Sequence, residues 1–99
     1  MARTDDILEI SQFFKVISDK TRLSILYLLK EKEQSVSELM EAIDMEQSAV
    51  SHQLRILKDS RLVRSRREGK SMIYQLDDEH IFGILDQVLE HIREREHTD

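Results

Sequence analysis

Four side chains near the carboxyl end of the chain have the types and the spacing of a metal site. Asp78 and His80 form a D-x-H pair, and after ten intervening residues His91 and Glu94 form an H-x-x-E pair. Imidazole nitrogen and carboxylate oxygen are ligands that zinc, cobalt and nickel all accept. The chain has no cysteine, which excludes thiolate sites of the kind that select soft metals.

The spacing of the two pairs predicts a site that two chains share. On a helix that turns by about 100° per residue, the eleven positions from His80 to His91 return both imidazoles to nearly the same face. The rings are then about 16 Å apart along the axis, whereas a zinc–nitrogen bond is about 2 Å long, so one ion cannot bind both. Two antiparallel copies of the helix, crossing near Gly83, would bring the Asp78 and His80 end of each chain to the His91 and Glu94 end of its partner. A two-fold homodimer would then hold two identical zinc sites.

A second group of side chains has the composition of a DNA-binding surface. Residues 51–70 carry seven basic and two acidic side chains, although the net charge of the whole chain is −5. A basic block between acidic flanks is typical of a face that binds a polyanion, and the alternative is an ordinary solvated surface. A helix predicted over 46–60 buries Val50, Leu54 and Leu57. Its other face carries groups suited to reading base edges of double-stranded operator DNA: Gln47, Ser48, Ser51, His52 and Arg55.

The elements around these residues follow from the period of the apolar side chains. Period-3.6 patterns predict helices over 5–18, from the N-cap Asp19 through 29, from a Ser35/Glu38 capping box to 43, over 46–60, and from Asp77 or Asp78 to the end of the apolar stripe at Ile92. Residues 30–34 are polar and read as a connection. Residues 62–66 and 70–76 read as strands joined by a turn at Glu68-Gly69.

This order of elements predicts a mainly α fold with a small β-hairpin, a winged helix-turn-helix that is homodimeric through its first and last helices. The hairpin would be the wing, and its cations are candidates for contacts with phosphate or the minor groove: Arg64, Arg66, Arg67 and Lys70. Strand alternation places Arg64 and Arg66 on the face opposite Arg67, so these arginines cannot all contact DNA together.

Length and composition narrow the class of protein. The 99 residues predict one domain, 1–99, whose modest core a dimer would help to complete. With no apolar run near 20 residues and no signal-peptide pattern, we expect a soluble, cytoplasmic protein. An enzyme is not expected, because four protein ligands leave zinc no open position for water and no nucleophile constellation accompanies them.

Three stretches of the sequence resemble the ArsR/SmtB family of metal-responsive winged-helix repressors, and the likeness covers nearly the whole chain. They are Asp19-Lys20-Thr21-Arg22 with Ile25-Leu26 and Leu29, Gln47 through Leu57, and Gly69 through Leu76. The resemblance implies that the metal-free dimer binds an operator and represses, and that Zn(II) weakens DNA binding and releases genes for metal efflux or sequestration. Asp78, His80, His91 and Glu94 match the motif of the family's zinc sensors whose site lies on the C-terminal helices.

The chain departs from the family pattern at two places. Relatives that sense arsenite, cadmium or lead use cysteines near the positions of Met40 and Ala42, and Glu46 stands where relatives often have a serine helix cap. Three alternatives stay open. The quartet could be no more than charged helix ends, the chain could be a regulator of this family that does not sense metal, or it could sense nickel or cobalt with His97 as an extra ligand.

Overall fold

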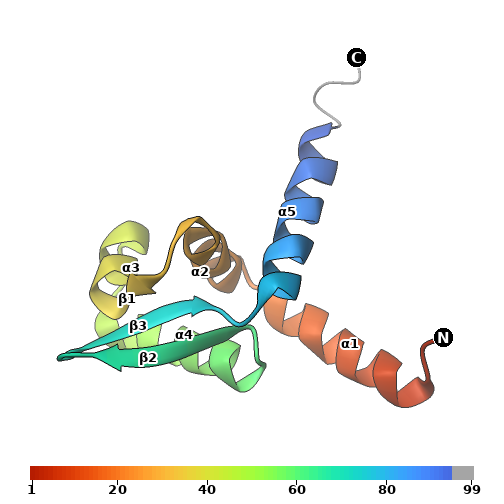
Figure 1. The fold of residues 1–99 in the computed structure, drawn as a ribbon, viewed down its shortest axis with the longest axis horizontal. Coiled ribbons are helices and arrows are strands. Elements are labelled where there is room, and N and C mark those ends of the chain that lie inside the picture. Colours follow the sequence, from red (N-terminus) through yellow and green to blue (C-terminus); the bar gives the residue numbers. More distant parts are fainter. Residues whose placement is uncertain (95–99) are drawn as a thin grey trace.

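Helices at both ends of the chain extend away from a body made of three helices and a small sheet (Figure 1). The computed structural model describes residues 1–94. In that range the elements are α1 (Thr4–Ile17), α2 (Lys20–Glu31), β1 (Gln34–Ser35), α3 (Val36–Ile43), α4 (Gln47–Asp59), β2 (Val63–Glu68), β3 (Ser71–Leu76) and α5 (Glu79–Glu94). The predicted helices are confirmed to within one or two residues at most of their ends.

The core lies where α2, α3 and α4 meet the sheet. Its fully buried side chains are apolar and come from each of these elements: Ile25, Leu26, Leu39, Val50, Leu54, Leu57, Leu62 and Val63. Ile81 and Leu85 bring the first half of α5 into the same cluster. The prediction that α2 is central, and that Val50, Leu54 and Leu57 face inward from α4, is confirmed.

Local signals in the sequence set the helix ends. The Asp19 carboxylate accepts a hydrogen bond from the Arg22 amide at 3.0 Å, which caps α2. Ser35 and Glu38 form the predicted capping box of α3, each side chain accepting a hydrogen bond from the other's amide, at 3.1 and 2.8 Å. Asp44 ends α3 in the left-handed conformation (φ 53°), so the chain turns sharply into α4.

Residues 30–34 differ from the expected polar connection. Helix α2 continues to Glu31, and Gln34 and Ser35 form a third strand that pairs with Tyr74 and Ile73 of β3. Gln34 is buried, and its side-chain amide donates a 2.9 Å hydrogen bond to the Leu28 carbonyl near the end of α2, which offsets the cost of burying a polar group. The sheet is antiparallel with the order β1-β3-β2.

The hairpin turn lies one residue later than predicted. Glu68 pairs with Ser71, which leaves Gly69 and Lys70 as the two turn residues. Gly69 has φ +63°, a backbone conformation that glycine adopts without strain. Helices α3 and α4, followed by the β2–β3 wing, make the winged helix-turn-helix that the sequence predicts.

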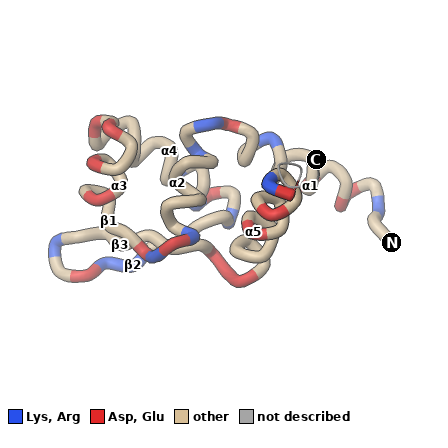
Figure 2. The backbone as a smooth tube through the Cα atoms, turned by 90° about the horizontal axis from the view of Figure 1, so that it is seen from above, with Lys and Arg blue, Asp and Glu red and all other residues tan. Residues whose placement is uncertain are grey.

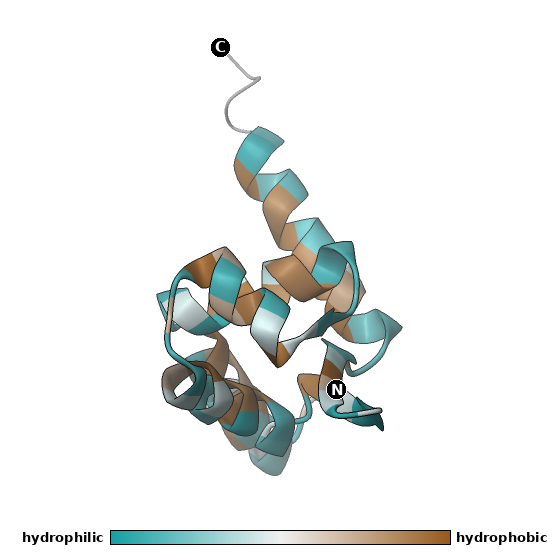
Figure 3. Cartoon of the chain, turned by 90° about the vertical axis from the view of Figure 1, so that its left-hand side faces the viewer, coloured by the Kyte–Doolittle hydropathy of each residue, from teal (hydrophilic) through white to brown (hydrophobic). Residues whose placement is uncertain are grey.

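The projecting helices expose apolar side chains. On α1 these are Ile7, Leu8, Ile10 and Phe14, and on α5 they are Phe82, Val88 and Ile92, each at least 45% exposed. Figure 3 shows hydrophobic bands continuing along α5 beyond the body. Among the described residues, no helix has the length and apolar character needed to cross a bilayer.

Candidate metal centre and nucleic-acid interface

Asp78 and His80 lie together at the amino end of α5. One Asp78 carboxylate oxygen accepts hydrogen bonds from the amides of His80 and Ile81, at 2.9 and 3.3 Å, and so caps the helix. The other oxygen is 3.4 Å from Nδ1 of His80. The His80 side chain is 90% exposed, so its imidazole is open to a ligand or to a second chain.

The Asp78 carboxyl is held in its ionised form. Partial burial raises its pKa, but the hydrogen bonds from the His80 side chain and from the Ile81 and His80 amides lower it further, and the net pKa is below its ordinary value of 3.8. At neutral pH Asp78 therefore presents a carboxylate, the form that a metal ion requires.

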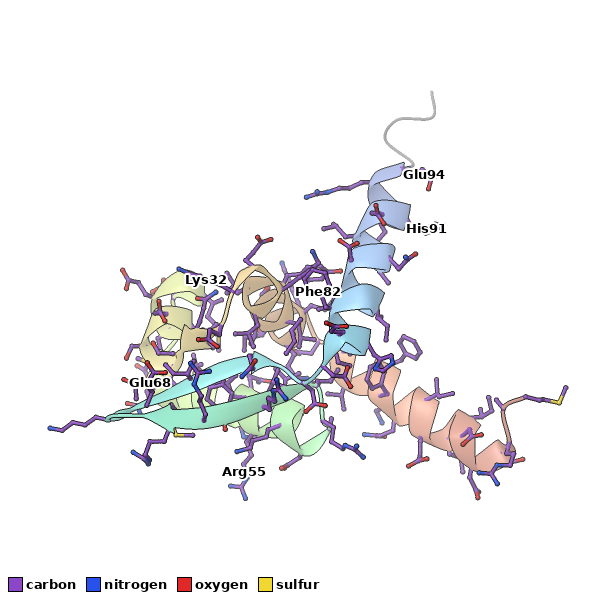
Figure 4. The ribbon with its side chains drawn as sticks, viewed as in Figure 1. Lys32, Arg55, Glu68, Phe82, His91 and Glu94 are labelled. Atoms are coloured by element: carbon purple, nitrogen blue, oxygen red, sulfur yellow. The ribbon has the colours of Figure 1, made fainter. Side chains whose placement is uncertain are left out.

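His91 and Glu94 lie at the far end of the same helix (Figure 4). Helix α5 runs without a break from Glu79 to Glu94, so the separation of about 16 Å between His80 and His91 that the spacing predicts applies to this structure. Within residues 1–94 no three potential ligands come together. One chain thus brings Asp78 to His80 and keeps this pair apart from His91 and Glu94, and the site shared by two chains stays a prediction. His97 lies outside the described residues.

Helix α4 presents its predicted reading face to solvent. Gln47, Ser48, Ser51, His52 and Arg55 are all exposed, on the side opposite the buried Val50, Leu54 and Leu57. Figure 4 shows Arg55 projecting away from the body. The side chain of Glu46, the N-cap residue, makes no capping hydrogen bond, so the amino end of α4 lacks the cap that a serine would supply.

Arg22 links the reading helix to the rest of the body, a role that the sequence did not reveal. Its Nε donates to the Val16 carbonyl in the last turn of α1 at 2.7 Å, and its Nη1 donates to the Gln53 side chain on α4 at 2.9 Å. Arg22 belongs to one of the three stretches that carry the family resemblance, and this was the one indication in the sequence that it has a specific role. The arginine fixes α4 relative to α1 and α2.

Helix α2 also contacts α5. The Tyr27 hydroxyl donates a 2.8 Å hydrogen bond to the Leu85 carbonyl in the middle of α5. Lys30 forms an ion pair with Asp86 at 3.2 Å and lies 4.6 Å from the centre of the Phe82 ring. The helix with the candidate ligands is thus joined to α2, and α2 is joined through Arg22 to the reading helix.

The wing cations divide between the two faces of the hairpin. Ser65 accepts a 2.8 Å hydrogen bond from Lys58 of α4, so Ser65 and Arg67 belong to the face on the side of α4. Arg64 and Arg66 lie on the other face, where Arg64 makes a long contact of 3.4 Å with Gln75. The backbone tube of Figure 2 shows basic and acidic residues following one another along the wing.

Arg66 differs from the other wing cations because acidic side chains already bind it. Its guanidinium makes two hydrogen bonds to Glu33, at 2.8 and 2.7 Å, and a third to Glu68 at 2.9 Å. The hydrogen bond from Arg66 lowers the pKa of the Glu33 carboxyl, and the two acidic partners raise the pKa of Arg66. Arg67 and the turn residue Lys70 are exposed.

Comparison with known proteins decides the family. Residues 19–65, which include α2, α3, α4 and the start of the wing, match the family described as bacterial regulatory protein, arsR family. The chain is 38% identical over 90 residues, 91% of its length, to the transcriptional repressor SmtB homolog of Synechocystis, of which it covers 68%. The chain belongs to the ArsR family.

Two further similar proteins agree with a role in transcription regulation. The cadmium resistance transcriptional regulatory protein CadC homolog of Staphylococcus aureus is 36% identical over 88 residues, which are 88% of this chain and 73% of the relative. A homodimeric winged helix-turn-helix DNA-binding domain of Mycobacterium bovis, a possible ArsR-family transcriptional regulator, superposes with a TM-score of 0.82 at 27% identity, covering 95% of this chain and 93% of that one. As an ArsR-family member with a DNA-binding fold, the chain is a transcriptional regulator and not an enzyme.

Proposed function

We propose that this ArsR-family regulator is a metal-responsive repressor. Its metal-free homodimer binds operator DNA, and Zn(II) bound between the two α5 helices weakens that binding and releases genes for metal efflux or sequestration. The observation that carries the proposal is the placement of two ligand pairs, Asp78 with His80 and His91 with Glu94, at opposite ends of one unbroken helix. We expect the protein to act in the cytoplasm, where its DNA is.

The apolar surfaces of α1 and α5 support the homodimer. Ile7, Ile10 and Phe14 on α1 and Val88 and Ile92 on α5 stay exposed in the single chain, and covering them with a second copy would remove their apolar surface from water. The homodimeric domain from Mycobacterium bovis has the same fold over nearly its whole length. A two-fold axis across α5 would place Gly83 and Leu85 near the crossing, with a ligand pair from each chain on either side.

The ligand chemistry favours zinc over the soft metals. Two imidazoles and two carboxylates supply nitrogen and oxygen donors, which suit tetrahedral Zn(II) and also admit Co(II) and Ni(II). The relative named for cadmium resistance gives no reason to expect cadmium here, because this chain has no cysteine to bind it. The ions would be held by Asp78, His80, His91 and Glu94.

We expect α4 and the wing to bind DNA. The exposed Gln47, Ser48, Ser51, His52 and Arg55 of the reading face have the donors and acceptors that reach base edges in a major groove. On the wing, Arg67 and Lys70 are exposed cations suited to phosphate contacts. Two such faces in a homodimer would bind two half-sites related by the same two-fold axis.

Contacts between helices offer a route from metal to DNA. Zinc would fix the angle between two α5 helices, Tyr27 and Lys30 join α5 to α2, and Arg22 joins α2 to Gln53 on α4. A small change in α5 would then favour one of two arrangements of the reading helices. By linkage, zinc lowers the affinity for DNA by the same factor by which DNA lowers the affinity for zinc.

Mobility shift of a duplex selected by the protein from a random library tests the proposal. With metal-free protein we expect a retarded complex, and its release on addition of zinc, with cobalt and nickel as parallel arms. The second candidate is a regulator that binds DNA without sensing metal, and the capping role of Asp78 favours it, because that carboxylate already has a structural use. Zinc titration against a chelator separates the two, since the second candidate would bind no stoichiometric zinc.

A further inference from the structure

The ion pair between Arg66 and Glu33 spans the sheet of the wing. Glu33 lies in the two-residue connection between the end of α2 at Glu31 and the start of β1 at Gln34. Ile73 of the central strand β3 pairs with Ser35 on one side and with Arg66 on the other. The Arg66 side chain therefore reaches across β3 and binds the element on the far side of the sheet with both terminal nitrogens, at 2.8 and 2.7 Å.

Arg66 also lies on the face of the sheet that is turned away from the reading helix α4. The neighbouring Ser65 is on the side of α4, because it accepts a hydrogen bond from Lys58, and strand alternation turns Arg66 to the opposite side. In Figure 4, Glu68, which shares the face of Arg66, lies on one side of the sheet and Arg55 of the reading face projects on the other. To reach a phosphate beside α4, Arg66 would have to give up its bonds to Glu33 and Glu68.

The geometry of the contact favours a fixed role. A guanidinium that meets a carboxylate through two parallel hydrogen bonds is held in one orientation, and Glu68 adds a third bond at 2.9 Å from the same hairpin. The connection that carries Glu33 is itself anchored, because Gln34 is buried and bonded to the carbonyl of Leu28. Besides the hydrogen bonds between its strands, the hairpin is therefore held to the connection between α2 and β1 by the Arg66–Glu33 contact.

We propose that Arg66 is a positioning residue that, with Glu33, fastens the wing to the connection between α2 and β1, so that Arg67 and Lys70 meet the phosphates while Arg66 meets none. The inference rests on the proposed DNA binding and deepens it. It also revises the sequence-based prediction that Arg66 is itself a contact with DNA. The binding energy that Arg66 contributes comes from keeping the wing in place before DNA arrives.

Salt dependence of DNA binding tests this proposal by counting phosphate contacts. Binding of the dimer of the 99-residue chain to its selected duplex and to a mixed-sequence duplex is followed by fluorescence anisotropy over a range of salt concentrations. Arg67→Gln and Lys70→Gln should each reduce the slope of log K against log salt by about two per dimer, one for each lost contact per chain. Arg66→Gln should lower operator affinity by roughly threefold to tenfold and leave the slope unchanged.

The direction in which Glu33→Gln changes the affinity for DNA distinguishes the two explanations most clearly. Removing an acidic side chain near DNA should raise affinity if only long-range charge matters, whereas loss of the fastening should lower it. Glu31→Gln, at the end of α2, makes the same change of charge two residues away and serves as the matched control. The reversed pair Glu33→Arg with Arg66→Glu, made in a Glu68→Gln background so that no carboxylate faces the new glutamate, restores the contact between positions 33 and 66 without a cation at position 66, so it should recover affinity that either single change loses in that background.

Three results would overturn the proposal. These are tighter binding by Glu33→Gln, a slope reduced by Arg66→Gln as much as by Arg67→Gln, or a reversed pair as weak as Arg66→Glu alone in the same background. Thermal unfolding of each variant checks that the fold is intact. A parent protein that binds neither duplex would overturn the proposed function itself, a result distinct from a parent that binds DNA while the variants break this pattern.

Discussion

Mixed dimers carrying His80→Ala in one chain and His91→Ala in the other test the shared metal site directly. If each site takes Asp78 and His80 from one chain and His91 and Glu94 from the other, the mixed dimer loses both histidines from one site and keeps all four ligands in the other. The unbroken helix between Glu79 and Glu94 sets this arrangement, because about 16 Å separates the two histidines of one chain. Either variant alone, as a homodimer, has one histidine missing from each site.

The expected stoichiometry follows from that geometry. The parent should bind about two zinc ions per dimer and the purified mixed dimer about one, whereas an unfractionated equal mixture, in which half of the dimers are mixed, should bind about a quarter of the parental amount. Chains with two different affinity tags allow the mixed dimer to be isolated, and chelator competition measures its tightly bound zinc.

A second pairing, with the same number of substitutions, provides the control. When one chain carries both His80→Ala and His91→Ala and its partner is the parent, each shared site loses one histidine and no intact site remains. Sites contained within single chains would give the reverse, one intact site in this control and none in the first mixed dimer. That reversed outcome would refute the shared-site reasoning.

The remaining predictions concern DNA reading, coupling, packing and pH. Ser51→Ala should weaken binding to the selected duplex by about 1–3 kcal/mol and leave the mixed-sequence duplex nearly unaffected, and equal losses on both would remove Ser51 from base reading. Tyr27→Phe removes the hydrogen bond to the Leu85 carbonyl and should reduce the effect of zinc on DNA affinity by about fivefold, while the zinc affinity of the DNA-free protein stays unchanged; an unaltered zinc effect would exclude this route. Leu54→Ala opens a cavity in the core and should cost about 2–5 kcal/mol in urea unfolding, so a loss below 1 kcal/mol would contradict the central position of this side chain. The pKa of Asp78 is lowered in the folded protein, so its ionised carboxylate stabilises the fold above its ordinary pKa of 3.8, and this contribution is lost as the pH falls below that value. The difference in unfolding free energy between the parent and Asp78→Asn should shrink over that pH range. A constant difference would mean that the cap does not depend on the charge of Asp78.

The fold could be predicted in large part because its signals are local. The Asp19 cap, the Ser35/Glu38 box and the spacing of Val50, Leu54 and Leu57 each determine structure within a few residues of themselves. Strand β1 could not be predicted, because two residues are too few to show an alternation of apolar and polar side chains. Gln34 is polar and would be expected at the surface, but its side chain is buried and donates a hydrogen bond to the Leu28 carbonyl near the end of α2. The turn at Gly69 and Lys70 was misplaced by one residue, since strand register depends on pairing and not on composition.

In the candidate sites, too, the features set by local sequence could be predicted and the contacts between distant residues could not. Alternation along β2 correctly separates Arg64 and Arg66 from Arg67, but nothing in the sequence pairs Arg66 with Glu33, which is 33 residues away. Arg22 and Tyr27 were missed for the same reason, because their partners are set by the packing of helices that are distant in the chain. The four candidate metal ligands differ from these residues. Their spacing in the sequence predicts a site shared by two chains, and the structure of one chain does not test it.

Strand β2 lies at one edge of the sheet, with the order β1-β3-β2 in the described part of the chain. A six-residue edge strand with unpaired backbone groups is a template onto which a second wing could add, and charged side chains are a common protection against such growth. Five of its six residues are arginine, serine or glutamate, and four carry charge. Neutralising these arginines to study DNA binding would therefore also weaken a barrier to aggregation, and light scattering of each wing variant should accompany its affinity. The charges on β2 would therefore disfavour pairing between the wings of neighbouring molecules, whichever of them contacts DNA.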